Sequence, residues 1–249
     1  MSFVGNYMKK YYYDFHMHSA LSPCAENEMT PQNMIKALKD RGFDAFALTD
    51  HNSARNVRAF DVFAKKEKII FVPGIEVESV EGIHIVTLFP SVDACEEMGN
   101  FVYENLVSIK NDVDIFGEQL VFDDEGKVID EEEFLLITST AITIDVIFEK
   151  AEELGGVAIF AHLERDSYSV VSNLGFVPVV KGKPPVEISV SDRGDDFLEQ
   201  YPEYNKYKLL RSSDSHRLSA FKEKLHFIEL DKEEKEVTAF DFVEWIKKG

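Results

Sequence analysis

The sequence predicts a single α/β domain of the barrel type, with a largely parallel sheet. Its 249 residues, 45% of them apolar, can bury one substantial core, and barrels commonly use this length as one domain. Five apolar runs lead into histidine or carboxylate, in Asp14-Phe15-His16-Met17-His18, Thr49-Asp50-His51-Asn52, Gly74-Ile75-Glu76, Ala161-His162 and Ser213-Asp214-Ser215-His216. The C-terminal strand ends of a (β/α) barrel form its active face, so this pattern predicts a multinuclear metal site there.

The first half of the chain alternates strands with helices. A strand at 11–15 is followed by a helix that begins at Thr30-Pro31 and ends at Gly42. A second strand at 43–48 leads to a helix for which Ser53 is a candidate cap, and a third strand covers 69–72. Strands separated by helices of this length indicate βαβ units. A further strand is expected at 83–89.

The stretch 91–140 interrupts this alternation. Two short apolar runs flank Asp124-Glu125-Gly126, which is a hairpin signal. We expect a small inserted hairpin and helical segment over the active end of the barrel. Alternation resumes with a helix from Thr143 to Gly155, strands at 157–160, 186–189, 207–210 and 227–230, and a terminal helix near 239–248. One domain is therefore predicted over 1–249.

Composition and charge narrow the classes of function. Apolar runs of about 18 residues, as a membrane span requires, are not found, and the first residues show no secretory signal, so a cytoplasmic protein is expected. The two cysteines, Cys24 and Cys95, give no disulfide framework. The net charge of −19 makes long duplex nucleic acid an unfavourable partner. A small phosphorylated substrate remains compatible, because bound divalent ions would invert the charge locally.

The histidine pairs carry the strongest chemical signal. His16 and His18 are two residues apart at a strand end, so both side chains leave the same face. Two imidazoles placed in this way form a half-site for zinc, manganese or iron. Asp214 and His216 repeat the spacing after a late strand, and Glu76 could bridge two cations through its two oxygens. Asp14 shares the parity of the first pair and could hydrogen-bond a histidine ring from behind.

These segments resemble the PHP (polymerase and histidinol phosphatase) family of metal-dependent phosphoesterases, in the family's order and over nearly the whole chain. The resemblance implies a distorted seven-stranded (β/α) barrel, TIM-like in form, with two or three divalent ions (Zn, Mn or Fe). It also implies a ligand set: His16, His18 and Asp214 for one ion, Glu76 as the bridge to a second, His162 for the second, and His51 and His216 for a third.

Three further positions have two readings each. His84 lies where many relatives place a second-metal ligand, or it is an inward-facing strand histidine bonded to backbone. Cys24 follows Ser22-Pro23 where relatives carry histidine or aspartate; its thiolate can ligate zinc, or it is a small buried thiol without a role. Arg165 is a candidate phosphate clamp, because guanidinium binds phosphate bidentately, or it pairs with a neighbouring carboxylate.

The expected reaction is hydrolysis of a phosphate ester by metal-activated water. Suitable substrates are a phosphomonoester, such as a sugar, nucleotide or histidinol phosphate, or a short oligonucleotide. Catalytic roles are expected for Asp50, His51, Glu76 and His216, with Asp50 or the third-site histidines relaying protons. One alternative is an amidohydrolase-like C–N hydrolase, although the carboxylated lysine of those barrels has no counterpart here. The other is a catalytically silent PHP module.

Overall fold

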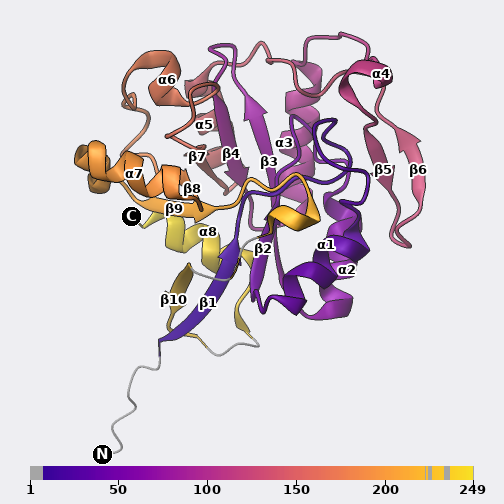
Figure 1. The fold of residues 1–249 in the computed structure, drawn as a ribbon, viewed down its shortest axis with the longest axis horizontal. Helices are drawn as coiled ribbons and strands as arrows, with labels where there is room; N and C mark the ends of the chain where they lie inside the picture. The colour runs from indigo at the N-terminus through magenta and orange to yellow at the C-terminus, as the bar shows by residue number, and fades with distance from the viewer. Residues whose placement is uncertain (1–7, 222, 224–225, 233–235, 249) are drawn as a thin grey trace, which may run out of the picture.

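The computed structural model describes residues 8–221, 223, 226–232 and 236–248. Within them, the main sheet has eight strands in the spatial order β10-β1-β2-β3-β4-β7-β8-β9. Their bounds are β1 (Lys9–Asp14), β2 (Ala45–Leu48), β3 (Ile70–Glu78), β4 (His84–Leu88), β7 (Val157–Phe160), β8 (Val186–Ser189), β9 (Leu209–Ser212) and β10 (Phe227–Leu230). The sheet curls, and a parallel bridge between Met17 and Ser215 joins the chain just beyond β1 to the chain just beyond β9 (Figure 1).

Strand direction shows how this barrel is distorted. β1, β2 and β3 are parallel to one another, as are β7, β8 and β9. β4 runs antiparallel to both of its neighbours, β3 and β7. β10 adds an antiparallel edge to β1. The predicted α/β barrel is confirmed, with seven strands around the curl and β10 beyond them.

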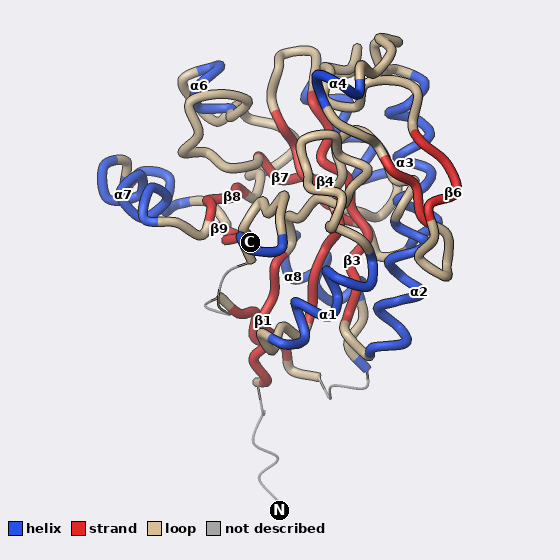
Figure 2. The backbone as a smooth tube through the Cα atoms, turned by 45° about the vertical axis from the view of Figure 1, so that its right-hand side comes forward, coloured by secondary structure: helices blue, strands red, loops and turns tan. Residues whose placement is uncertain are grey.

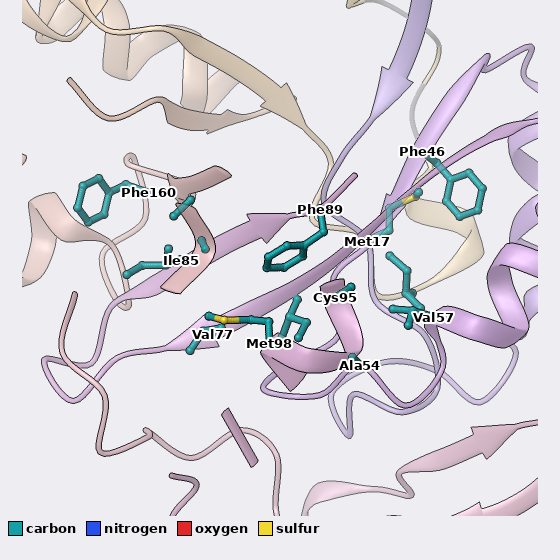
Figure 3. Packing of buried hydrophobic residues seen from close by; sticks show 14 of the residues in the cluster. Met17, Phe46, Ala54, Val57, Val77, Ile85, Phe89, Cys95, Met98 and Phe160 are labelled. Atoms are coloured by element: carbon teal, nitrogen blue, oxygen red, sulfur yellow. The ribbon is translucent and has the colours of Figure 1, made fainter. Parts of the chain in front are cut away.

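Most of the helices cover the convex side of the sheet, while the last one packs against its concave side (Figure 2). The helix bounds are α1 (Pro31–Asp40), α2 (Val57–Glu67), α3 (Val92–Glu104), α4 (Val113–Phe116), α5 (Ile144–Glu153), α6 (Val170–Leu174), α7 (Asp192–Gln200) and α8 (Ala239–Lys247), with short 3₁₀ turns at Pro202–Lys206 and Leu218–Ala220. Apolar residues of α1, α2, α3 and α5 share one core cluster with alternate residues of the strands. Figure 3 shows this packing around Phe89, with Met98 and the buried Cys95 of α3 beside it.

The start of α1 agrees with the sequence, and that of α2 does not. The Thr30 hydroxyl accepts a hydrogen bond from the Asn33 amide, as an N-cap should. Helix α2 begins only at Val57, preceded by Asn56, which makes no side-chain cap bond. Ser53 instead accepts from the Arg55 amide, in the loop before the helix. The predicted cap at Ser53 was therefore wrong by about one turn.

The terminal helix α8 closes the concave side of the sheet. Its Phe242 is fully buried and meets the rings of Tyr11 and Phe15 edge-on, with centroids 5.9 and 5.4 Å apart. Thr238 and Asp241 form a capping box at its start. These contacts belong to a second core cluster, which the inward-facing residues of the strands complete. The C-terminal strand ends remain available for polar side chains.

The segment 91–140 consists of two parts. Helix α3 lies in the convex layer, with Cys95, Met98 and Val102 in the main core cluster. The later part forms α4 and the predicted hairpin, β5 (Leu120–Phe122) with β6 (Val128–Glu131). The Leu120 amide donates to the carbonyl of Ala20 at 2.7 Å, which fixes the hairpin on the loop after β1. None of the helices among the described residues is long and apolar enough to span a membrane.

Candidate metal centre

Glu76 lies at the centre of a ring of histidines. It is a buried residue of β3, and its carboxylate faces imidazoles from several strand ends. The nitrogen–oxygen distances are 3.2 Å from His16, 3.0 Å from His84 and 3.2 Å from His162 to Oε1, and 3.4 Å from His18 and 3.0 Å from His51 to Oε2. One carboxylate thus presents each of its oxygens to at least two possible ligands.

The direction of β4 explains why His84 belongs to this ring. His84 is the first residue of β4 and pairs with Glu78, near the end of β3. Because β4 is antiparallel, its N-terminal end lies at the same edge of the sheet as the C-terminal ends of the parallel strands. Its Nδ1 faces Glu76, and its Nε2 lies 3.7 Å from the carboxylate of Glu78. Its side chain therefore lies with the candidate ligands.

Asp214 is a second carboxylate that the imidazoles of His16 and His18 approach, beside Glu76. Its Oδ1 lies 3.1 Å from Nε2 of His18 and 3.4 Å from Nε2 of His16. Among the described residues, three groups of side chains have ligand atoms within 4.8 Å of one another: His16, His18 and Asp214; His51, Glu76 and His84; and His18, His51 and His216. The first group is the set that the resemblance implies for one ion.

The backbone is strained at two of these residues. His162 has a φ of 30° and Asp214 a φ of 50°. Left-handed conformations are uncommon for side chains other than glycine, and they concentrate at functional sites where the surrounding structure enforces them. In both cases the residue directly follows a strand or its extension and turns its side chain toward Glu76 or His18. The strain accompanies the convergence of the ring.

Several buried polar atoms of the ring make no hydrogen bond. Among the described residues these include Nε2 of His16, Nε2 of His18, Oε2 of Glu76 and Oδ1 of Asp214. Leaving buried donors or acceptors unsatisfied is unfavourable, and charged groups in such a place normally hold a metal or a partner. Imidazole nitrogens with carboxylate oxygens are also the donor set of zinc, manganese and iron sites. The residues present therefore fit divalent ions.

The pKa shifts within the ring also indicate a site that binds positive charge. Burial by itself would lower the pKa of His84, but the adjacent Glu76 carboxylate raises it to about 9. Burial also opposes the rise at His16, whose pKa the carboxylates of Glu187, Asp214 and Glu76 nevertheless hold well above the usual value. The pKa of Glu76 is lowered by the surrounding imidazoles against the effect of burial. The carboxylates thus attract positive charge, which protons supply in the metal-free protein.

Comparison with known proteins gives a family and a fold. The sequence pattern of the PHP domain matches residues 14–208, more than half of the chain. The chain belongs to the PHP domain family. The match includes the first four histidine and carboxylate segments, while Ser213–His216 lies just beyond it. A search of curated proteins gave no match.

Solved structures of low sequence identity share the PHP fold of this chain. The lesion-specific endonuclease PfuEndoQ from Pyrococcus furiosus aligns with a TM-score of 0.58 at 17% identity, over 84% of this chain and 49% of that one. A putative metal-dependent phosphoesterase from Bifidobacterium adolescentis gives 0.53 at 13%, over 82% and 87%. An amidohydrolase from Chromobacterium violaceum with bound sulfate gives 0.53 at 17%, over 88% and 92%. This PHP domain spans about half the length of the endonuclease.

Glu187 is a site residue of this PHP domain that the sequence analysis missed. It is a buried residue of β8, and its Oε1 lies 2.9 Å from Nδ1 of His16 and accepts from the His162 amide at 3.3 Å. Asp14 was expected to orient a histidine ring. Its carboxylate instead accepts from the backbone amides of Ser213 and His16. The orienting contact thus comes from β8, while Asp14 fixes the backbone between β1 and β9.

Asp50 is directed away from the ligand ring. Its carboxylate accepts from the amide and the hydroxyl of Ser19, both at 2.7 Å, and from the hydroxyl of Ser22 at 2.8 Å. Ser22 is in turn 3.0 Å from Nδ1 of His18. The Asp50 carboxylate therefore connects to the ring through Ser22, and its proposed part in proton relay stays a prediction.

His216 and Cys24 lie at the outer side of the PHP site. The His216 ring stacks on His18 with centroids 4.2 Å apart, and its Nδ1 donates to the carbonyl of Asp214 at 2.9 Å. Burial, together with the charge of His18, lowers the pKa of His216 to about 3, so it is neutral. Cys24 is exposed. Burial and the charge of His18 would lower the pKa of His51, but Cys24 and Glu76 together raise it. The alternative reading of Cys24 as a buried thiol is wrong, while ligation by Cys24 stays a prediction.

Arg165 reaches the centre from the loop after β7. Its guanidinium forms an ion pair with Oδ2 of Asp214, and 42% of its side chain is exposed. The expected alternative partners were Glu164 and Asp166. Glu164 instead accepts from Ser189, and Asp166 pairs with Arg193. Arg165 thus lies between a candidate ligand and solvent, where a clamp for an anionic substrate would have to be.

Proposed function

We propose that this PHP domain hydrolyses phosphate esters with two or three divalent ions. The observation that carries the proposal is the Glu76 carboxylate, buried among imidazoles, where its own Oε2 and Nε2 of His16 and of His18 lack hydrogen bonds. His16, His18 and Asp214 would hold one ion, Glu76 would bridge it to a second held by His84 and His162, and His51 and His216 would serve a third. Bound ions of this kind lower the pKa of water and neutralise phosphoryl oxygens.

The chain's own residues would then position the ester. Arg165 can donate two parallel hydrogen bonds to phosphoryl oxygens while it stays within reach of Asp214. His216 is neutral and uses Nδ1 as a donor to a carbonyl, so its Nε2 is left as an acceptor. That nitrogen can ligate an ion at the edge of the site, although the low pKa of His216 disfavours its taking up a proton. The Asp50–Ser22 contact holds His18 in its orientation.

We propose a small phosphorylated molecule or a short oligonucleotide as the substrate. The net charge of −19 opposes long-range attraction of polyanions. A structure of Endonuclease Q with a 27-mer duplex containing an abasic lesion shares this fold, with a TM-score of 0.55 at 16% identity over 83% of this chain and 49% of that one. The fold by itself therefore does not exclude a duplex. An abasic duplex belongs in the substrate panel for this reason.

The proposal is tested by metal content and hydrolysis together. After mild purification, or reconstitution with manganese, iron or zinc, elemental analysis should find at least two ions per chain. The loaded protein should then hydrolyse members of a panel of sugar, nucleotide and histidinol phosphates, short single strands and an abasic duplex. Metal below one ion per chain would contradict the proposed centre. Turnover of amides but not phosphate esters would favour a C–N hydrolase, and full loading without any turnover would favour a silent module.

Glu76→Gln is the matched variant for this assay. It preserves volume but removes the charge that faces the imidazoles on both oxygens. We expect loss of more than tenfold in rate, which corresponds to over about 1.4 kcal/mol in barrier, and a lower metal content. Circular dichroism should show an unchanged fold. A variant that keeps both metal and rate would rule out a bridging Glu76.

A further inference from the structure

Tyr168 stands over the exposed side of the histidine ring. Its side chain stacks face to face on His84, with centroids 4.7 Å apart and planes 16° from parallel. Tyr168 is 49% exposed, whereas His84 is only 9% exposed. The tyrosine ring therefore covers one face of this imidazole and turns its own opposite face toward solvent.

The loop that carries Tyr168 is tied to the site at three points. It begins at His162, which faces Glu76, and continues through Arg165, which pairs with Asp214. The carbonyl of Tyr168 accepts from the His84 amide at 2.9 Å. Ser169, which follows, donates to the carbonyl of Arg165 at 2.9 Å and closes the loop on itself. This loop therefore contacts three different residues of the ring.

Tyr168 also adopts an unfavourable backbone conformation. Its φ is 58°, in the left-handed region that bulky side chains rarely enter. A residue in this region persists where the surrounding contacts enforce it, and such residues concentrate at functional sites. The contacts that hold Tyr168 here are the stacked ring and the backbone hydrogen bond, and both are made with His84.

His84 differs from His16 and His18 in how its ring is oriented. His16 is oriented by Glu187 and His18 by Ser22, each through a hydrogen bond of about 3 Å to the nitrogen away from the centre. On His84 the corresponding nitrogen, Nε2, has Glu78 only at 3.7 Å, beyond normal hydrogen-bond length. Stacking by Tyr168 thus takes the place of an orienting hydrogen bond.

We infer that Tyr168 is a positioning residue, whose ring holds His84 in the orientation that lets Nδ1 share an ion with Glu76. This inference rests on the proposed metal centre. It predicts that the aromatic face is what matters, and that the phenolic hydroxyl is not required. It also predicts that Tyr168 acts only through His84.

The test is titration calorimetry of the metal-free full chain with Mn²⁺ and with Zn²⁺. Tyr168→Asn removes the ring, yet asparagine tolerates a positive φ, so the loop should keep its course. Metal affinity at the site that His84 would share with Glu76 should fall about tenfold or more, as for other residues that orient a ligand. Tyr168→Phe should bind as the wild type does. Tyr201→Asn is the matched control, because Tyr201 is a 39% exposed tyrosine whose ring contacts Phe197 and Tyr204 rather than a histidine.

A double variant separates positioning from general stability. In a His84→Ala background, Tyr168→Asn should have no further effect on affinity, because the residue it positions is gone. If the melting temperature of metal-free Tyr168→Asn shows that it does not fold, Tyr168→Leu replaces it in the calorimetry. Three results would each overturn the inference. They are a wild-type metal affinity in Tyr168→Asn, a metal affinity in Tyr168→Phe as low as that of Tyr168→Asn, and an effect of Tyr168→Asn that is as large in the His84→Ala background as in the wild type. Failure of the wild type itself to bind metal would instead refute the proposed centre.

Discussion

At the scale of single residues, His16 and His18 are fixed by contacts on the side away from Glu76. Glu187 takes Nδ1 of His16 and Ser22 takes Nδ1 of His18. Such contacts select the tautomer and the orientation that leave Nε2 for a metal. In both histidines, Nε2 is the buried atom without a hydrogen bond. The proposed ligands are thus already prepared in the metal-free protein.

Glu187→Gln tests this arrangement. The amide keeps the volume of the side chain but loses the charge that faces His16, and metal affinity should fall by about 10- to 100-fold. Glu164→Gln is the matched control, because Glu164 is a buried carboxylate nearby that binds Ser189 instead of a histidine. Calorimetric titration of both variants measures the difference. Equal losses in the two would show that any buried carboxylate at this end acts only on stability.

Sequence alone identified the ligands more readily than the residues that orient them. The spacing of His16 and His18 at a strand end predicts that both are ligands. Glu187 is a single glutamate in a short strand, and its histidine partner lies 171 positions away. The available signal was a carboxylate between the apolar residues Val186 and Ile188 of a predicted strand. Asp14 has the better spacing to His16, but the fold directs its side chain to the amide of Ser213.

Cys24 allows a second test at this scale. If its thiolate ligates a third ion with His51, Cys24→Ala should lower metal content by one ion, and Cys24→His should preserve it. If the thiol is not a ligand, metal content should stay the same in Cys24→Ala, while His51→Ala still lowers it. An anomalous-scattering map of a metal-loaded crystal decides between them. Metal farther than about 2.6 Å from the sulfur would reject ligation, since zinc–sulfur bonds are about 2.3 Å.

At the scale of elements, strand direction decides which residues meet. The sequence predicted strands near 69–72 and 83–89, but β3 extends to Glu78 and β4 runs against it. Periodicity in a buried apolar strand carries no information about direction. For the same reason the sequence left His84 with two readings. Helix α3 was included in the expected insertion, although the spacing of Cys95, Met98 and Val102 is that of a helix face against a core.

Helix α8 offers a test of the barrel's closed side. Phe242 is fully buried against Tyr11 and Phe15, whereas Phe240, two residues earlier, is 53% exposed. Phe242→Ala should lower the free energy of unfolding by about 3–5 kcal/mol, and Phe240→Ala should change it by less than about 0.5 kcal/mol. Denaturant unfolding of both variants gives the comparison. Similar effects in the two would mean that α8 does not fill the concave side.

At the scale of the whole molecule, the excess of acidic residues extends into the buried ring, where carboxylates raise histidine pKa values. The chain carries 46 acidic and 27 basic residues, and its carboxylates raise the pKa of His84 to about 9 despite burial. Relative to an ordinary pKa of 6.5 for the unfolded chain, protonated His84 stabilises the metal-free fold. That contribution is complete below the unfolded value and is lost as pH rises through about 9. A metal needs the neutral imidazole, so a metal ion and a proton compete for the same nitrogen of His84.

This competition predicts the pH dependence of metal binding. Loading at pH 7 should release protons, which calorimetry detects as a binding enthalpy that changes with the ionisation enthalpy of the buffer. The rise in melting temperature on adding a fixed concentration of Mn²⁺ should be small at pH 6 and larger at pH 8.5. Protonated imidazoles bind the metal more weakly at pH 6, and the stabilisation by a ligand grows with its affinity. His84→Ala should release fewer protons at pH 7. An enthalpy independent of buffer, or a larger thermal shift at pH 6, would show that the ring binds metal without giving up protons and that its imidazoles are neutral beforehand.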